Sequence, residues 1–331
     1  MKPRPLGNSG LLVSPIGLGL AALGRPGYIN LGHEQDMQGD IDPSVMEARA
    51  HAVLDAAWAA GVRYFDAARS YGAAERFLGN WLRSRAIPPE EVTIGSKWGY
   101  TYTADWRVQA EHHEIKDHSA ALLRRQWEET QTQLGGYLDL YQIHSATFES
   151  GVLENREVHR ELAEIHSTGV RIGLTLSGPQ QAEILETAMA IRVDGERLFD
   201  TVQATWNLLE PSAGPALTKA RNEGMGVVIK EGVANGRLTE RNTSADFQDK
   251  RAILEKTAHR LGGSLDALAL AAILAQPFAD VVLSGAATSE QLTSNLQAPN
   301  LAWDEISAQE LQTLVETSAD YWARRSALSW N

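Results

Sequence analysis

Strand-like and helix-like stretches alternate along almost the whole chain of 331 residues. Eight of them are short and strand-like, and three of these (62–66, 92–97 and 138–144) have several β-branched or aromatic residues in a row and are bounded by Gly, Pro or Ser, the pattern of buried strands. The eight stretches lie at residues 17–19, 62–66, 92–97, 138–144, 170–174, 201–204, 226–229 and 281–284. Strands that alternate with helices build a parallel sheet. Eight such units in a chain of this length predict a closed (β/α)₈ TIM barrel rather than an open doubly wound sheet.

The stretches between the strands carry helix signals. Helical patterns lie at residues 45–60, 120–134 and 212–222. Asp42 and Ser44 offer capping side chains before the first of these helices, and Gly61 follows it. Residues 24–43 read as a long polar loop. No linker rich in Pro, Gly or Ser divides the chain, so we expect one domain, residues 1–331.

Polar side chains stand at or just beyond the ends of three of the predicted strands. Asp66 and Tyr71 follow one apolar run, Lys97 ends the next, and His144 ends a third. The C-terminal ends of barrel strands open into one shared cleft, so we expect these side chains to meet there. A free phenol has a pKa near 10, and a nearby ammonium would lower it towards the working pH of a general acid. The four residues together predict a proton relay.

In these motifs the sequence resembles the aldo-keto reductase family, and the similarity covers nearly the whole chain. The family's motifs are matched in order by residues 4–19, 62–72, 92–99, 140–144, 202–209 and 285–295. The resemblance implies a barrel with an N-terminal β-hairpin and a C-terminal loop or helix over the active-site cleft. It also implies hydride transfer between a nicotinamide dinucleotide and a carbonyl or alcohol carbon.

The resemblance gives each of the four polar residues a role. It implies that Tyr71 is the general acid in reduction and the base in oxidation, and that Lys97 tunes it. It implies that Asp66 holds Lys97 and that His144 orients the substrate carbonyl. The alternative is a purely structural role, in which Asp66 and Lys97 form a buried ion pair, Tyr71 is an aromatic residue at the rim, and His144 is a core histidine.

The same resemblance implies a cofactor site. Thr175 and Leu176 stand where relatives usually place Ser-Asn to hold the nicotinamide carboxamide, and Gln203 matches the carboxamide-binding glutamine. Lys230 occupies the position of an aromatic residue that stacks on the nicotinamide ring. Further cofactor contacts are expected at Gly232, Asn235 and Gly285.

The resemblance also addresses the choice between NAD(H) and NADP(H). Residues 283–295 are similar to the family's adenosine-phosphate site, but they contain no Lys or Arg, and Gln291 replaces the usual Arg. Asn295 matches the adenine-contacting asparagine. A 2′-phosphate needs a cation, so NAD(H) is favoured, as in sugar dehydrogenases of the L-galactose or aldose 1-dehydrogenase type. Lys230 or Arg237 is the alternative source of a phosphate contact.

Aromatic residues are expected to line the substrate mouth. Trp98, Tyr100 and Trp206 follow the strands that carry the site, and the C-terminal segment adds Tyr321, Trp322 and Trp330. Such walls suit carbonyl compounds, aromatic aldehydes and sugar rings alike. The polar loop offers side chains that either contact substrate or are solvated, namely Arg25, Tyr28, His33 and Asp36.

Composition excludes several classes of function. The net charge of −12 argues against non-specific binding of nucleic acid or anionic membranes. The chain has no Cys, which excludes disulfides and thiolate chemistry. It shows neither a signal peptide nor an apolar run of about 20 residues, so we expect a soluble cytoplasmic protein acting on a small molecule.

Two other functions stay open at this point. A cofactor-binding sensor or regulatory subunit with little turnover, resembling the auxiliary subunits of potassium channels, is the main alternative. A barrel hydrolase would hold a metal through His144 and Asp66. His113 and Asp117 have helical metal-ligand spacing, but we expect a polar loop there and no metal site.

Overall fold

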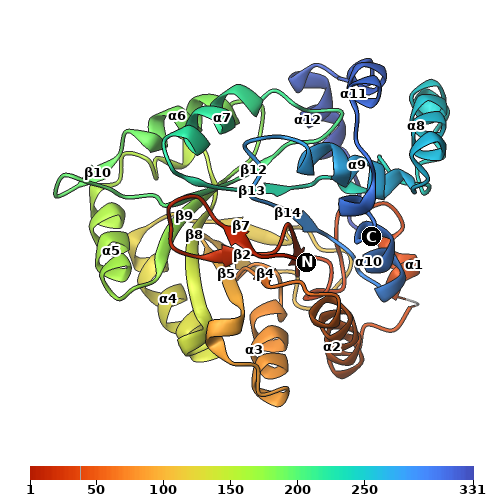
Figure 1. Ribbon diagram of the computed structural model, residues 1–331. Helices are drawn as coiled ribbons and strands as arrows, with labels where there is room; N and C mark the ends of the chain where they lie inside the picture. The colour runs from red at the N-terminus through yellow and green to blue at the C-terminus, as the bar shows by residue number, and fades with distance from the viewer. Residues whose placement is uncertain (38) are drawn as a thin grey trace.

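The computed structural model describes residues 1–37 and 39–331. Eight parallel strands close into a barrel at its centre, each paired with its neighbours in chain order (Figure 1). They are β3 (Ile16–Gly19), β4 (Tyr64–Asp66), β5 (Thr93–Trp98), β8 (Leu138–Ala146), β9 (Arg171–Leu176), β12 (Thr201–Thr205), β13 (Gly226–Lys230) and β14 (Val281–Ser284). The predicted TIM barrel is therefore confirmed, with each strand within two residues of its expected bounds.

Helices surround the barrel, and most of them connect successive strands. These are α2 (Pro43–Ala59), α3 (Ala74–Ser84), α4 (Ala120–Leu134), α5 (Arg156–Ser167), α6 (Gln181–Met189), α7 (Gly214–Asn222) and α9 (Leu265–Leu274), with α10 (Ser289–Asn295) after the last strand. An outer group packs on α9 through a second apolar cluster and consists of α8 (Gln248–Leu261), α11 (Glu305–Gln312) and α12 (Ser318–Ser326) (Figure 1).

The predicted helix signals are used as expected. Asp42 caps α2 by accepting a hydrogen bond from the backbone N–H of Ser44 at 2.8 Å. Gly61 follows this helix with a φ of +86°, a left-handed conformation that glycine adopts without strain. Ser119 caps α4 through the N–H of Leu122 in the same way.

A short hairpin closes the N-terminal end of the barrel, as predicted. Its strands are β1 (Arg4–Pro5) and β2 (Leu12–Val13). Gly7 in the turn has a φ of +54°, and a Cβ there would lie 2.3 Å from the backbone nitrogen of Gly226 at the start of β13. Only glycine allows this approach, and the open end of the barrel is consequently the opposite one.

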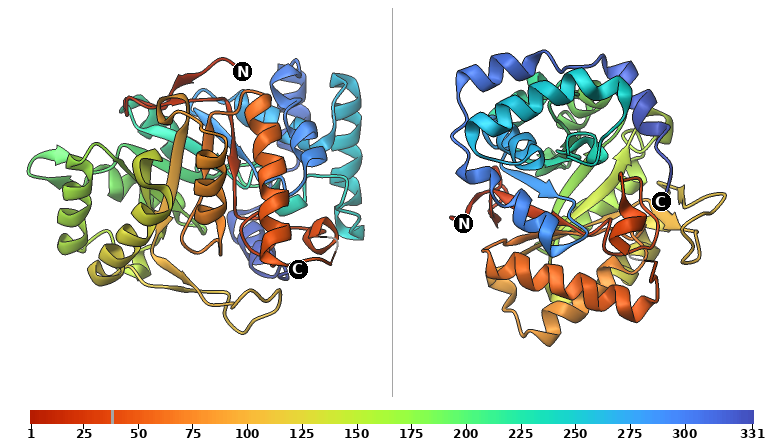
Figure 2. Two further views of the ribbon diagram at one scale, coloured as in Figure 1. Left: turned by 90° about the horizontal axis from the view of Figure 1, so that it is seen from below. Right: turned by 90° about the vertical axis from the view of Figure 1, so that its right-hand side faces the viewer.

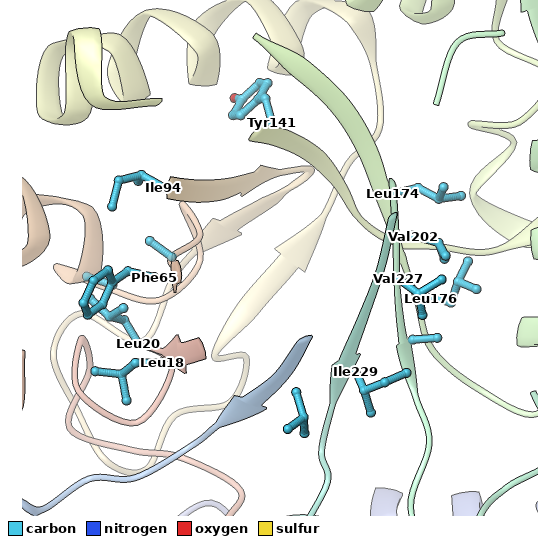
Figure 3. Close-up of a cluster of buried hydrophobic side chains, with 14 of the residues drawn as sticks. Leu18, Leu20, Phe65, Ile94, Tyr141, Leu174, Leu176, Val202, Val227 and Ile229 are labelled. Carbon is cyan, nitrogen blue, oxygen red and sulfur yellow. The ribbon is translucent and has the colours of Figure 1, made fainter. Parts of the chain in front are cut away.

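The strand periodicity divides the core into two parts. Outward-facing side chains such as Phe65, Ile94 and Tyr141 pack against the helices in one large cluster (Figure 3). Inward-facing side chains such as Tyr64 and Val228 fill the bottom of the barrel in a smaller cluster. Burying each large apolar side chain contributes about 1.5–3 kcal/mol, so the barrel is a rigid support for the polar groups at its upper rim.

Two segments predicted as polar loops contain regular structure. The His-rich stretch, residues 112–118, overlaps the second strand of a hairpin formed by β6 (Tyr100–Tyr102) and β7 (Glu114–Lys116). Residues 24–43 contain α1 (His33–Met37). Neither segment shows apolar periodicity in its sequence. Contacts with distant parts of the chain hold both in place instead. Figure 2 shows the C-terminus near α1, where Asn331 and Tyr28 exchange backbone hydrogen bonds of 3.0 and 3.1 Å.

Within the part of the chain that the structure describes, none of the helices has the length and apolar character needed to cross a membrane.

Candidate active site

A cavity opens at the C-terminal ends of the barrel strands, where the sequence predicts the site. Its wall includes eight of the predicted site residues, namely Asp66, Tyr71, His144, Gln203, Lys230, Gly232, Asn235 and Gly285. It runs from the ends of β4 and β8 past β12 and β13 to the end of β14.

Asp66 and Lys97 form an ion pair beneath this cavity. Their side chains are almost completely buried, and Lys97 Nζ also donates to the carbonyl oxygen of Ala67 at 2.9 Å. The other carboxylate oxygen of Asp66 accepts from Tyr64 Oη at 3.0 Å. Gly95 leaves room for this contact, since a Cβ there would lie 2.8 Å from the Tyr64 hydroxyl.

Two glutamines complete the surroundings of Asp66. Gln142 Nε2 and Gln203 Nε2 each donate to its Oδ1 at 3.2 Å. Asp66 is thus satisfied by four side chains, and this network fixes the ammonium of Lys97 in one position. The carboxamide of Gln203, expected to hold the nicotinamide, is committed in part to this network.

Tyr71 and His144 face each other in the cavity. Tyr71 Oη lies 3.5 Å from His144 Nε2, and Ser70 Oγ lies 3.3 Å from His144 Nδ1. Lys97 Nζ lies 4.8 Å from the centre of the Tyr71 ring. The four residues predicted to relay a proton therefore come together, with both polar tips of the Tyr71–His144 pair in the cavity wall.

The electrostatic surroundings differ from the sequence-based expectation for Tyr71. Burial, followed by the carboxylate of Asp66, raises the pKa of the Tyr71 hydroxyl above its ordinary value of 10.0. The expected lowering of this pKa is absent because burial disfavours the phenolate and the Asp66 carboxylate adds to that effect. Burial, followed by the charges of Lys97 and Lys230, lowers the pKa of His144 well below 6.5. Both side chains are therefore neutral near pH 7.

The residues expected to hold the nicotinamide lie around β9 and β13. Thr175 is buried, and its Oγ1 accepts from the backbone N–H of Ser145 at 2.7 Å. Lys230 Nζ donates to Thr205 Oγ1 at 3.1 Å, and burial lowers its pKa to about 8. The buried Oδ1 of Asn235 has no hydrogen-bond partner within the described residues, which makes it an acceptor available to a ligand.

The segment after β14 contacts the polar loop of residues 24–43 through side-chain hydrogen bonds. Gln291 Nε2 donates to both carboxylate oxygens of Asp36, each at 2.9 Å, and Arg241 Nη1 donates to Asp36 at 2.8 Å. Asn295 Nδ2 donates to Ser284 Oγ at 2.8 Å, and Ser284 lines the cavity. The amide group of Gln291 is thus hydrogen-bonded to the carboxylate of Asp36.

The predicted aromatic wall is only partly correct. The ring centroid of Tyr100 lies 5.0 Å from that of His144. Trp330 lines the cavity. The prediction is wrong for Trp98 and Trp206, which lie in the apolar core: Trp98 follows the inward-facing Lys97 and points outward, and Trp206 packs on Phe278. Tyr321 and Trp322 are also buried, in the second apolar cluster.

Charged side chains complete the cavity wall. Arg25 and Tyr28 of the polar loop line it, while His33 and Asp36 are buried rather than solvated. Four further wall residues, all outside the predicted set, are Glu114, Ser145, Glu231 and Arg325. Glu231 binds Arg325 at 2.7 Å and has a φ of +55°, an unusual conformation for a non-glycine residue.

The sequence model of the aldo/keto reductase family matches residues 15–316. The chain belongs to the aldo/keto reductase family. It is accordingly an NAD(P)-dependent oxidoreductase that acts on carbonyl or alcohol groups, and nicotinamide dinucleotides are the cofactors of the family. The described residues contain no group of three or more His, Cys, Asp or Glu side chains arranged to hold a metal ion.

Relatives of this aldo-keto reductase align over most of its length. The uncharacterized oxidoreductase YqkF of Bacillus subtilis is 26% identical over 95% of this chain and 97% of that protein. Pyridoxal 4-dehydrogenase of Microbacterium luteolum is 26% identical over 88% and 91%. L-Galactose dehydrogenase of Arabidopsis thaliana is 23% identical over 95% and 94%.

A solved structure shares the fold of this aldo-keto reductase. The holo form of an aldo-keto reductase from Bacillus halodurans superposes with a TM-score of 0.74 at 24% identity, over 96% of this chain and 97% of that one.

Some further residues around the site of this aldo-keto reductase carry a local sequence signal, and others carry none. Tyr64 lies two residues before Asp66, and Gln142 lies two residues before His144, so the alternation of strand side chains places each on the same face as the predicted residue. Arg325 and Glu114 lie in a helix and a hairpin far from the barrel motifs, where the local sequence gives no indication.

Proposed function

We propose that this aldo-keto reductase moves a hydride between a nicotinamide dinucleotide and the carbonyl or alcohol carbon of a small substrate, an aldehyde, ketone or aldose. The observation that carries the proposal is the approach of Tyr71 Oη to His144 Nε2, 3.5 Å apart in the cavity wall beside the Asp66–Lys97 pair. Two polar tips at this distance suit a carbonyl oxygen that accepts hydrogen bonds from both.

Tyr71 is the proposed proton donor in reduction. Its raised pKa keeps the phenol protonated near pH 7, so it has a proton to give to the oxygen of the reacting carbonyl. Lys97 lies close enough to stabilise the phenolate that remains after transfer, and Asp66 holds Lys97 in place. In oxidation the same groups work in reverse, with Tyr71 as the base.

His144 is the proposed orienting group. As a neutral imidazole it donates one hydrogen bond and accepts another. Ser70 Oγ beside Nδ1 can donate to that nitrogen, which leaves the proton on Nε2, towards Tyr71 and the substrate oxygen. Trp98, outside the cavity, has no part in this proposal.

The residues along the cavity fit the family's cofactor. The open space around Gly285 and the available acceptor of Asn235 suit an elongated ligand, and the cation of Lys230 suits a phosphate. When bound, the nicotinamide supplies or accepts the hydride. We assign its binding to Thr175, Gln203, Lys230, Gly232, Asn235, Gly285, Gln291 and Asn295. Lys230 takes a phosphate-binding role in this assignment, since an ammonium cannot stack as an aromatic ring does.

NAD(H) is the proposed cofactor. A 2′-phosphate near Gln291 would meet the carboxylate of Asp36, which Gln291 and Arg241 hold in place. Neither alternative cation is free for a 2′-phosphate, because Arg237 is paired with Glu316 at 2.6 Å, and Lys230 is assigned to another phosphate of the dinucleotide and lies 3.9 Å from Glu231. Unphosphorylated ribose hydroxyls, in contrast, can donate to a carboxylate.

The names of two relatives support an aldose as the substrate. L-Galactose dehydrogenase and a D-threo-aldose 1-dehydrogenase of a Pseudomonas species, 25% identical over 65% of this chain and 69% of that protein, are named for sugars. The cavity wall also has the paired charges and aromatic rings that suit hydroxylated rings.

A regulatory, cofactor-binding role remains the second candidate. It is favoured by Gln203, whose amide binds Asp66, and by Lys230 in the place of an aromatic residue. It predicts tight dinucleotide binding without turnover.

One experiment separates these proposals. NAD(H) and NADP(H) are titrated side by side by quenching of protein fluorescence, and turnover is then measured with a panel of aldoses and aldehydes. Preferred binding of NAD(H) with aldose oxidation is the expected result. Binding without turnover over the whole panel would support the regulatory role, and binding of neither dinucleotide would contradict both.

A further inference from the structure

Arg25 occupies an unusual position beside Tyr71. Its side chain is buried and lines the cavity, and its guanidinium carbon lies 5.2 Å from the centre of the Tyr71 ring. Arg25 Nη1 donates to Glu114 at 2.9 Å and to the carbonyl oxygen of Ser70 at 3.1 Å. Trp330, near the C-terminus, covers the same guanidinium at 4.7 Å. Segments distant in sequence thus meet on one side of the reacting position.

This pair has hydrogen-bonding capacity left over. Arg25 Nε is buried and has no hydrogen-bond partner among residues 1–37 and 39–331. Glu114 accepts from Arg25 through Oε2, and its side chain is 25% exposed, so its other oxygen is available at the cavity wall. A buried donor without a partner is costly unless a ligand satisfies it. The wall therefore offers a donor and an acceptor side by side, next to Tyr71.

Hydroxyl groups match this arrangement better than other ligand groups. A hydroxyl both accepts and donates, so two neighbouring hydroxyls can take one hydrogen bond from Arg25 and give one to Glu114. A carboxylate or phosphate would be attracted by Arg25 but repelled by Glu114, which balances its charge. A purely apolar group would leave both polar groups unsatisfied.

The aromatic surroundings suit a ring that carries such hydroxyls. Trp330 is held by stacking on His113, with 3.8 Å between ring centroids and 4° between planes. Tyr28 lines the same region, with its ring 5.4 Å from the Arg25 guanidinium. Rigid aromatic faces beside a donor–acceptor pair present both the apolar and the polar surfaces that a hydroxylated ring needs.

We propose that Arg25 and Glu114 form the substrate subsite that binds hydroxyl groups next to the reacting carbon, with Trp330 against the substrate's apolar face. This inference rests on the proposed oxidoreductase function and narrows its substrate to neutral compounds with hydroxyls beside the carbonyl carbon. It makes Arg25 and Glu114 the residues that separate such substrates from plain aldehydes.

The test compares glyceraldehyde with propanal, which has the same carbon chain without the hydroxyls. The variants are Glu114→Gln and Arg25→Met, and the control is Glu111→Gln, which removes an exposed carboxylate from the same hairpin. We expect both subsite variants to lose about ten- to a hundredfold in kcat/KM for glyceraldehyde and much less for propanal, as for loss of a charge-assisted hydrogen bond. The control should lose neither activity.

An equal loss for both aldehydes would overturn the subsite, since Arg25 and Glu114 would then act on Tyr71 alone. An unchanged preference for glyceraldehyde would overturn it as well.

A binding measurement covers the case in which neither aldehyde turns over. Galactose is titrated against the tryptophan fluorescence of the wild type, Glu114→Gln and Glu111→Gln in the presence of the dinucleotide. Binding that is lost only in Glu114→Gln would keep the subsite while the proposed activity fails. Equal binding by all three proteins, or binding by none, would refute the subsite itself.

Discussion

The ammonium group of Lys97 lies 4.8 Å from the centre of the Tyr71 ring while it is bound to Asp66. The lysine is near enough to stabilise charge on the phenol, but its own charge is already balanced. Burial of Tyr71, followed by the carboxylate of Asp66, keeps the pKa of Tyr71 raised rather than lowered. In the proposed mechanism Tyr71 therefore donates a proton, and the ammonium of Lys97 stabilises the phenolate that remains.

Lys97→Met should destabilise the protein severely. Removing one partner of a buried ion pair leaves the carboxylate of Asp66 without its cation, at a cost of about 3–5 kcal/mol in the free energy of unfolding. Denaturant unfolding measures this cost. The double variant Asp66→Asn/Lys97→Met should recover part of it, because no unpaired charge remains. Additive losses in the double variant would mean that the two side chains are not coupled.

Stability should fall in mild acid through His33 and His118. Burial lowers the pKa of each from 6.5 to about 4. Between these values the unfolded state binds a proton that the folded state does not, so the free energy of unfolding decreases as pH falls from about 6.5 to about 4. Unfolding at a series of pH values should give a smaller slope for His33→Phe than for the wild type.

The exposed His112 provides the control for this measurement. His112→Gln should keep the wild-type slope across the same pH range. An unchanged slope in His33→Phe would mean that this histidine is protonated in the folded protein.

Cofactor preference should respond to the Asp36–Gln291 contact. The double variant Asp36→Asn/Gln291→Arg removes a carboxylate and adds a guanidinium, so binding of NADPH relative to NADH should improve about tenfold or more. Fluorescence titration of both dinucleotides measures this ratio. Gln297→Arg, which adds one guanidinium at an exposed position just after α10, should leave the ratio unchanged. A similar shift in both variants would point to net charge rather than to this contact.

The sequence alone predicted the barrel because strand and helix patterns are local. The third residue of β4, the fifth of β5 and the seventh of β8 face inward at the rim once their strands are placed, so Asp66, Lys97 and His144 can be predicted from spacing and family resemblance. The same alternation, applied to Trp98, would have directed it into the core. The alternation of strand side chains therefore predicts the buried position of Trp98, and the assignment of Trp98 to the substrate mouth is wrong.

Other parts of the site depend on contacts between segments far apart in sequence. Arg25 meets Glu114 and Trp330, and Gln291 meets Asp36, across separations that no local pattern encodes. The raised pKa of Tyr71, which comes first from burial and then from the Asp66 carboxylate, likewise depends on the three-dimensional packing of the site.

Tyr71→Phe tests the central claim most directly, because it removes one hydroxyl and leaves the ring in place. The proposed role predicts that kcat falls by about 10²–10⁴-fold, as for loss of a general acid, while dinucleotide affinity from fluorescence titration is preserved. Tyr137→Phe, which removes a hydroxyl bound to the Ile87 carbonyl oxygen far from the cavity, should turn over like the wild type. Turnover by Tyr71→Phe at a rate comparable to the wild type would contradict the account.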